Sequence, residues 1–186
     1  EETEQDVESH MADYEKQVGK VFNVKGYGAI GDGVTDDTDA INSALTDAKA
    51  VKGTLYFPQG TYLVSEQINI DDFVIIQGSR ISDRGTAIKT TANAPIFYVT
   101  QKCRISSLSL IGDNNASNTL QDGIFIDNIN EVIIDDCFFM NLYNDIHIKD
   151  TVFYSVIRHC EFYSAKNALI FGEGTSDAGY QVQIND

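Results

Sequence analysis

The hydrophobic positions change their spacing twice along this chain of 186 residues. In residues 1–21 they recur at alternating steps of four and three, with acidic or polar residues between them. An amphipathic helix packed on its own domain is one explanation, but a helix this short and polar is marginal alone. The heptad spacing therefore favours a coiled-coil stem that associates with other copies. Its seam consists of Val7, Met11, Tyr14, Val18 and Val21.

Residues 22–54 are predicted to hold a first strand and a helix. The strand is expected at VFNVK, and TDDTDAINSALTDA follows with Thr35 or Asp36 as N-cap and acids in its first turn. We expect this helix to lie across the end of a β-structure and to close its core, because an open end leaves strand edges exposed. One apolar stripe repeats at helical spacing along it: Ala40, Ile41, Ala44, Leu45 and Ala48.

From residue 55 onward, period-2 alternation and turn residues replace the helical spacing, and the strands repeat. DGIFIDN, DIHIKD and ALIFGE align so that Ile124, Ile146 and Leu169 share one column, at steps of 22 and 23 residues. Alternation within a long fixed period is the signature of a solenoid. The fold class is therefore predicted to be all-β, an incomplete parallel β-helix over residues 55–186 with one coil per repeat.

A second series of strands repeats in the same frame. VIIDDCFF and SVIRHCEF align at a step of 23 residues, which places Cys137 over Cys160 in an inward column. CRISSLSL fits one coil earlier at a step of 29, and the polar insert DNNASN accounts for the excess. The two cysteines are expected to be reduced core residues. Together with Cys103 they form neither a disulfide framework nor a zinc pattern.

The stretch GYGAIGDG at residues 26–33 matches the dinucleotide-binding pattern G-x-G-x-x-G, but its surroundings do not. The strand expected after the helix, TLYF, has no acid at its end, and no second strand–helix unit follows. An EF-hand fails too, because the ligand order and the glutamate at its twelfth position are missing. The glycines are therefore expected to turn the chain sharply from the first strand toward the helix.

The charge balance narrows the choice of partners. The chain carries 28 acidic against 13 basic residues, for a net charge of −15. Nucleic acid and anionic membranes both require a basic face, so neither is an expected partner. No basic-then-apolar signal segment opens the sequence, and no apolar run is long enough to span a membrane. We expect no cofactor, no bound metal and no membrane insertion.

Two stretches carry a resemblance to a known family. VFNVKGYGAIGDGVTDDTDAINSAL and GTLYFPQGTYLV are similar to the opening of the pectate-lyase-like superfamily of right-handed β-helices, which includes polygalacturonases, epimerases and many bacteriophage tailspikes. The heptad helix before them resembles the stems of phage tail proteins, which are typically trimers. The combination is similar to tail appendages of phages of Gram-positive hosts, whose spikes bind or degrade wall polymers such as teichoic acid. This resemblance implies a homotrimer in the virion tail, outside the cell, that contacts other tail proteins and host carbohydrate.

The same resemblance points to candidate catalytic positions. Polygalacturonases place the motifs N-T-D, D-D and G-H-G before consecutive strands of one sheet. Here Asp122 matches the first acid, Asn144 replaces one member of the pair, Asp145 keeps the other, and KNA at residues 166–168 stands at the His motif. The resemblance therefore implies Asp122 and Asp145 as the catalytic residues of an incomplete set. Alternatively, Asp122, Asn144 and Asn167 form a ladder of hydrogen bonds along the axis. Enzymatic activity is left open.

Outward positions suggest a carbohydrate-binding strip. Phe125 and His147 alternate with inward isoleucines and are expected side by side on adjacent coils, with Asp145 on the same outward face. Lys149 is expected to stack on Asp127. Sugars favour an aromatic ring beside imidazole and carboxylate groups. A contact between trimer subunits is the alternative use of this face.

Another set of charged residues is expected to pair across adjacent coils. Asp135 should lie near Arg158, and Asp136 near His159, as ordinary ion pairs.

Three functions are compatible with these observations. A phage tailspike or tail appendage that recognises, or also degrades, a host cell-surface glycan unites stem, cap and solenoid. A secreted polysaccharide hydrolase or lyase fits the fold, and a purely structural trimeric tail connector fits every feature. We favour the first. We also expect a fragment of a longer protein, because YQVQIND repeats the frame with Val182 and Ile184 inward and no second cap follows.

Overall fold

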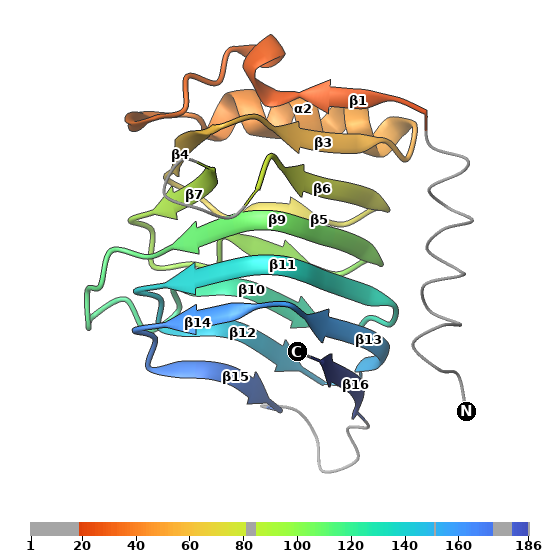
Figure 1. Cartoon of the computed structure of the whole chain (residues 1–186), viewed down its shortest axis with the longest axis vertical. Helices are drawn as coiled ribbons and strands as arrows, with labels where there is room; N and C mark the ends of the chain where they lie inside the picture. The colour runs from red at the N-terminus through yellow and green to blue at the C-terminus, as the bar shows by residue number, and fades with distance from the viewer. Residues whose placement is uncertain (1–18, 81–84, 151, 173–179, 186) are drawn as a thin grey trace.

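The computed structural model describes residues 19–80, 85–150, 152–172 and 180–185. They form an all-β parallel solenoid with one α-helix among the described residues (Figure 1). Each coil contributes one strand to a five-stranded sheet, so the solenoid has about five turns. The predicted parallel β-helix is thereby confirmed.

The strands fall into two parallel sheets. The five-stranded sheet contains β5 (Ile68–Ile70), β8 (Phe97–Val99), β10 (Asp122–Asp127), β12 (Asn144–Lys149) and β15 (Asn167–Phe171). The other sheet contains β1 (Val21–Asn23), β2 (Asp32–Asp36), β3 (Thr54–Phe57), β4 (Gly60–Val64), β6 (Val74–Gly78), β7 (Thr86–Thr90), β9 (Cys103–Ile111), β11 (Val132–Met140), β13 (Val152–Arg158), β14 (Glu161–Tyr163) and β16 (Tyr180–Asn185).

The strand register reproduces the columns expected from the sequence repeats. Ile124 pairs with Ile146, which pairs with Leu169 on the next coil. The longer step of 29 residues is correct as well, since Leu108 pairs with Cys137. Because parallel strands in register point equivalent side chains the same way, these columns fill the interior with stacked aliphatic residues. The interior is a single apolar core running through the solenoid.

The larger sheet bends along a line of left-handed residues, which the repeats did not predict. Ser107, Asp136 and His159 have φ of 57°, 53° and 51°. The residues directly before them pair with one another on successive coils, so these three occupy equivalent positions. The bend lets β9 and β11 run through two faces of the solenoid without a break. Gly78 occupies the same line one coil earlier, where a Cβ atom would overlap the Ser107 carbonyl oxygen.

The α-helix α2 (Thr38–Ala50) lies at one end of the solenoid, beside β1 and β3 (Figure 1). Its predicted stripe is confirmed, because Ile41, Ala44, Leu45 and Ala48 are buried. The predicted N-cap is wrong by one or two residues, since the helix begins at Thr38 with Asp37 at the N-cap position.

The Asp37 carboxylate is used in the glycine loop instead of capping the helix. Its oxygens accept hydrogen bonds from the backbone N–H groups of Ile30 at 2.6 Å and Gly31 at 3.1 Å. A short 3-10 helix, η1 (Val24–Tyr27), leads from β1 into this loop. Gly28 and Gly31 have φ of 105° and 70°, values that favour glycine. The expected structural role of the loop is therefore confirmed.

Four predicted stem positions, Val7, Met11, Tyr14 and Val18, lie outside the described residues. The fifth, Val21, opens β1 and pairs with Thr54, so it belongs to the sheet and not to a helix. Within the described part of the chain, no helix combines the length and apolar character needed to cross a membrane.

Candidate functional site

An aromatic column runs across the outer face of the five-stranded sheet. Tyr98, Phe125 and His147 occupy equivalent positions on β8, β10 and β12. The rings of Tyr98 and Phe125 stack, with centroids 5.3 Å apart and 9° between their planes. Phe125 meets His147 edge-on at 4.6 Å. The predicted proximity of Phe125 and His147 on adjacent coils is confirmed. His147 is only 6% exposed, however, so its imidazole is largely covered by its neighbours.

A ladder of polar side chains runs beside this column, where β10, β12 and β15 begin. The Asn167 amide donates to Asn144 Oδ1 at 2.8 Å, and the Asn144 amide donates to Asp122 Oδ1 at 2.6 Å. The second Asp122 oxygen lies 2.9 Å from His147 Nδ1. The hydrogen-bonded ladder expected from the sequence is confirmed. Asp122 is 3% exposed and holds its neighbours in place.

Asp145 has a very different environment from Asp122. It lies between the Asn144–Asp122 and Ile146–Ile124 pairs, opposite Gly123, whose Cβ direction points at the core residues Phe139 and Leu142. Asp145 is 0% exposed, and neither carboxylate oxygen has a hydrogen-bond partner among the residues that the structure describes. Burial raises its pKa to about 7.

The structure therefore does not join the two predicted catalytic carboxylates on an accessible surface. Asp122 is bound to Asn144 and His147, while the Asp145 carboxyl is closed off from solvent. The strict alternation expected at the start of β12 is wrong, because Asp145 lies opposite the inward-facing Gly123 and directly before the inward Ile146. His147 Nε2 is also buried without a partner.

Lys149, the third predicted binding residue, stands at the other end of the strip. Its Nζ lies 3.6 Å from Asp127 Oδ2 and 3.8 Å from Asp150 Oδ2, and its side chain is 37% exposed. The Tyr98 hydroxyl donates to the same Asp127 oxygen at 2.7 Å. The predicted stacking of Lys149 on Asp127 is confirmed, and it leaves the ammonium group accessible. An ion pair this exposed contributes little stability.

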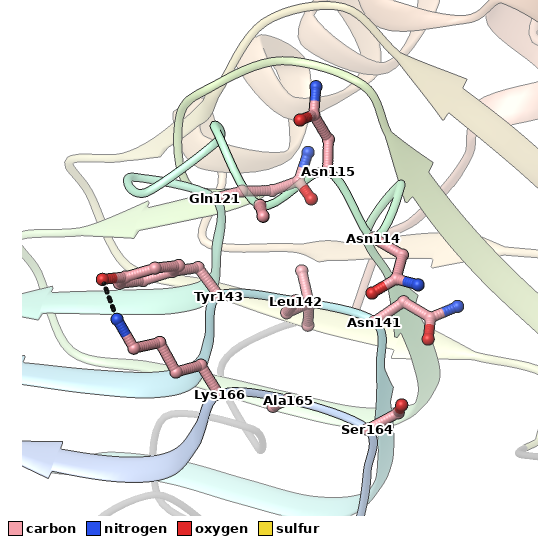
Figure 2. A pocket seen from close by; sticks show the side chains of 10 residues that line it. Asn114, Asn115, Gln121, Asn141, Leu142, Tyr143, Ser164, Ala165 and Lys166 are labelled. Carbon is pink, nitrogen blue, oxygen red and sulfur yellow. Dashed lines mark hydrogen bonds between the residues drawn. The ribbon is translucent and has the colours of Figure 1, made fainter.

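A groove of about 380 Å³ opens at the edge of the same sheet (Figure 2). It is formed by the turns that lead into β12 and β15 and by the polar insert between β9 and β10. Tyr143 and Lys166 lie side by side in it, and Lys166 Nζ donates to the Tyr143 hydroxyl at 2.6 Å. The lining residues are Asn114, Asn115, Ala116, Gln121, Asn141, Leu142, Tyr143, Ser164, Ala165 and Lys166.

Several polar groups of the groove have no partner within the described residues. The Gln121 side chain is an exception, because its amide nitrogen donates to Ala92 O and its oxygen accepts from Asp113 N. The side chains of Asn114, Asn141 and Ser164 make no hydrogen bond with the described part of the chain. Asn114 N donates to the Asn141 carbonyl at 3.2 Å, which brings the two free amides together. The groove thus combines unpaired amide and hydroxyl groups with one ammonium group.

Sequence reasoning missed this groove although its cause is visible in the repeats. The insert DNNASN lengthens one coil, and the following turns at 141–143 and 164–166 stay short. The long connection lies over the short ones and leaves a hollow between them (Figure 2). In the sequence, the insert indicated only a longer repeat and not that it would form one side of a groove.

A second hollow, of about 520 Å³, lies on the larger sheet near Asp135. Burial raises the pKa of Asp135, but hydrogen bonds from Arg158 and His159 outweigh it and hold the pKa below its usual value. The predicted pair of Asp135 and Arg158 is confirmed at 3.1 Å. The predicted pair of Asp136 and His159 is wrong, because His159 lies 2.9 Å from Asp135 and Asp136 accepts from Ser107.

Metal binding has no visible basis in this region. Among the described residues, no three or more His, Cys, Asp and Glu side chains are grouped so that they could hold a metal ion.

Comparison with known proteins gives two kinds of relative. Residues 21–104 match the model of a family described as rhamnogalacturonase A/epimerase, pectate lyase-like. Mannuronan C5-epimerase AlgE6 of Azotobacter vinelandii is 34% identical over 122 residues, which cover 56% of this chain and 14% of that protein.

Phage proteins share the fold over nearly the whole chain. ORF18 of Geobacillus virus E2 superposes with a TM-score of 0.69 at 21% identity, covering 97% of this chain and 43% of that one. Gene product 12 of bacteriophage phi29 superposes with a TM-score of 0.54 at 18% identity, covering 97% and 34%. The chain thus spans less than half of each of these proteins. The resemblance to pectate-lyase-like right-handed β-helices, those of phages included, is confirmed.

Proposed function

We propose that this pectate-lyase-like β-helix is part of a bacteriophage tail protein that recognises a carbohydrate of the host cell surface. Support comes from the phage proteins that share its fold over 97% of the chain and from a relative that is named as an epimerase of a polysaccharide. On this proposal the protein lies in the virion tail, outside the cell, and contacts other tail proteins.

The observation that carries the proposal is the groove at the edge of the five-stranded sheet. Glycans present hydroxyl groups at their edges and C–H groups on their ring faces, so they bind where hydrogen-bonding side chains adjoin aromatic rings. Here the free side chains of Asn114, Asn141 and Ser164 supply hydrogen bonds, and Tyr143 supplies a ring. A volume of about 380 Å³ falls within the range of small-ligand sites.

The groove is less acidic than the chain as a whole. Among the described residues that line it, Lys166 alone is charged, although the net charge of the chain is −15. A polyanion would be repelled by the surrounding surface, so a neutral or zwitterionic polymer is the ligand class we favour. Lys166 would then meet any negative group of a zwitterionic unit.

Binding is favoured here over catalysis by this segment. Inverting hydrolysis requires two carboxyl groups about 6.5–9.5 Å apart on either side of the scissile bond. Asp122 is bound to Asn144 and His147, and the Asp145 carboxyl is closed off from solvent. A hydrolase or lyase would need a different pair of residues or a rearranged β12.

The proposal also assigns roles to both parts of the N-terminal region. We infer that α2 caps the solenoid, since its buried stripe packs beside β1 and β3 at the end of the sheet. The heptad seam of residues 7–18 is proposed to join three copies into a parallel homotrimer. A trimeric connector without a ligand is the competing function.

The test is binding to a panel of bacterial surface polysaccharides, wall teichoic acid included, measured by isothermal titration calorimetry. The double variant Asn141→Ala and Lys166→Ala should weaken binding at least about tenfold, because each lost hydrogen bond contributes roughly 1 kcal/mol and more when charged. Lys89→Ala, which removes a lysine of β7 in the other sheet, serves as the matched control and should bind normally. Absence of binding to every polysaccharide would favour the connector.

A further inference from the structure

Cys137 and Cys160 lie opposite each other on adjacent coils. Their neighbours Phe138 and Glu161 are paired in register between β11 and β14, so the two cysteines occupy the same inward position. Cys137 is fully buried and Cys160 is partly buried, and both are free thiols. Each follows a residue with left-handed backbone, Asp136 or His159, so the chain presents both sulfur atoms in the same way.

The two thiols lie in one inward column and influence each other. The neighbouring Cys137 thiol lowers the pKa of Cys160, whereas the Cys137 thiol itself donates to the backbone carbonyl of Asp135 at 3.4 Å. Burial is the main reason that the pKa of Cys137 is raised. Cys160 Sγ also lies 3.9 Å from the Ile134 carbonyl oxygen of the coil that contains Cys137. The sulfur of Cys160 therefore reaches across the space between the coils.

The spacing of the coils suits a disulfide bond. Neighbouring strands of a sheet lie about 4.7–4.9 Å apart, and disulfides join residues whose Cα atoms are about 4.4–6.8 Å apart. A bond at this position would connect two coils directly.

We propose that Cys137 and Cys160 form a single oxidation site at which a disulfide oxidant links the two coils covalently. Cys160 is the most accessible of the three thiols, since Cys103 and Cys137 are buried, and it reacts first. Its thiolate attacks one sulfur of oxidised glutathione and releases one molecule of glutathione. The Cys137 thiolate then attacks the Cys160 sulfur and releases the second. Two protein thiols are oxidised, one glutathione disulfide is reduced, and the two protons pass to the released thiolates.

Cys103 provides an internal control for this site. It is fully buried, and burial raises its pKa to about 12. Its registered neighbours, Val74 and Val132, carry no sulfur. Cys103 is therefore expected to stay reduced under conditions that oxidise the pair.

The experiment treats the folded chain with oxidised glutathione, alkylates the remaining thiols in denaturant and maps the peptides by mass spectrometry. One Cys137–Cys160 bond and one alkylated Cys103 are expected. The bond closes a loop of one coil, so the melting temperature should rise by roughly 5 °C. Three alkylated cysteines, or a bond that includes Cys103, would overturn the proposal.

Three variants separate the two steps of the reaction. In Cys137→Ser the reaction should stop at glutathione attached to Cys160. In Cys160→Ser both remaining thiols should stay reduced, and in Cys103→Ser the bond should form as before. Circular dichroism of each variant before oxidation checks the fold. If glutathione accumulates on Cys160 of the unmodified chain, the two sulfur atoms cannot meet and the proposal is wrong.

Discussion

Replacing the buried carboxyl of Asp145 should stabilise the protein in a manner that depends on pH. Asp145 is 0% exposed, its oxygens have no partner, and burial raises its pKa from 3.8 to about 7. The folded state therefore holds the proton more tightly than the unfolded state. This proton-linked stability is fully present below pH 3.8 and is lost as the pH rises through about 7.

The size of the effect follows from the pKa difference. One pKa unit corresponds to about 1.4 kcal/mol, so ionisation of Asp145 lowers the free energy of unfolding by up to about 4 kcal/mol at pH 8 relative to pH 4. Asp145→Asn keeps the shape of the side chain and removes its titration. The variant should exceed the unmodified chain in stability by roughly 2–4 kcal/mol at pH 8, and the difference should shrink toward zero near pH 4.

Urea unfolding followed by circular dichroism at pH 4, 5, 6, 7 and 8 measures this difference. Carboxylates with lowered pKa values, such as Asp36 and Asp135, lose their stabilising contacts in acid, but they do so in both proteins and cancel in the comparison. Asp150→Asn is the matched control, because Asp150 is partly exposed and its positive φ suits asparagine. Parallel stability curves for Asp145→Asn and the unmodified chain would refute the reasoning.

Three further predictions concern assembly, the bend and the binding face. The chain should scatter light as a trimer at micromolar concentration, and Tyr14→Asp should release monomers; a monomeric unmodified chain would contradict the stem. Gly78→Ala should lower the free energy of unfolding by about 1–3 kcal/mol in urea, because its Cβ would overlap the Ser107 carbonyl, whereas Gly26→Ala has open space and should be neutral. Phe125→Ala with His147→Ala should weaken polysaccharide binding in calorimetry while the trimer persists, because the aromatic column lies on the sheet whose edge forms the groove; unchanged binding would exclude the column from the site.

Repeats that involve many residues were predictable from the sequence, and so was the fold. The isoleucine columns at Ile124 and Ile146 follow from a period that every coil must satisfy, because a shift of one residue would turn the apolar side chains outward. The ladder of Asp122, Asn144 and Asn167 was predictable for the same reason, since equivalent turn residues stack.

Features that depend on a single residue's backbone were not predictable. Asp145 was expected outside because alternation was extended to the first residues of β12, where two consecutive residues, Asp145 and Ile146, face the core. His159 was paired with the wrong acid because its imidazole lies 2.9 Å from Asp135, while Asp136 accepts from Ser107. Aspartate and histidine are enriched at positive φ, but this weak signal does not say which of them adopts that conformation. The N-cap was misplaced because the loop recruits the Asp37 carboxylate.

The position of the groove follows from differences between coils. In a regular solenoid each turn lies directly over the next, and identical turns leave no room between them. Here the connection from β9 to β10 spans residues 112–121, while those into β12 and β15 span only 141–143 and 164–166. The long connection must pass over the short ones, and polar residues suit it because it faces water on one side. The repeat thus supplies a sheet with aromatic side chains at equivalent positions. The insert between β9 and β10 supplies hydrogen-bonding groups along one side of the groove. Changes of ligand specificity are therefore expected to map to the insert, since substitutions in the columns would disturb every coil that stacks on them.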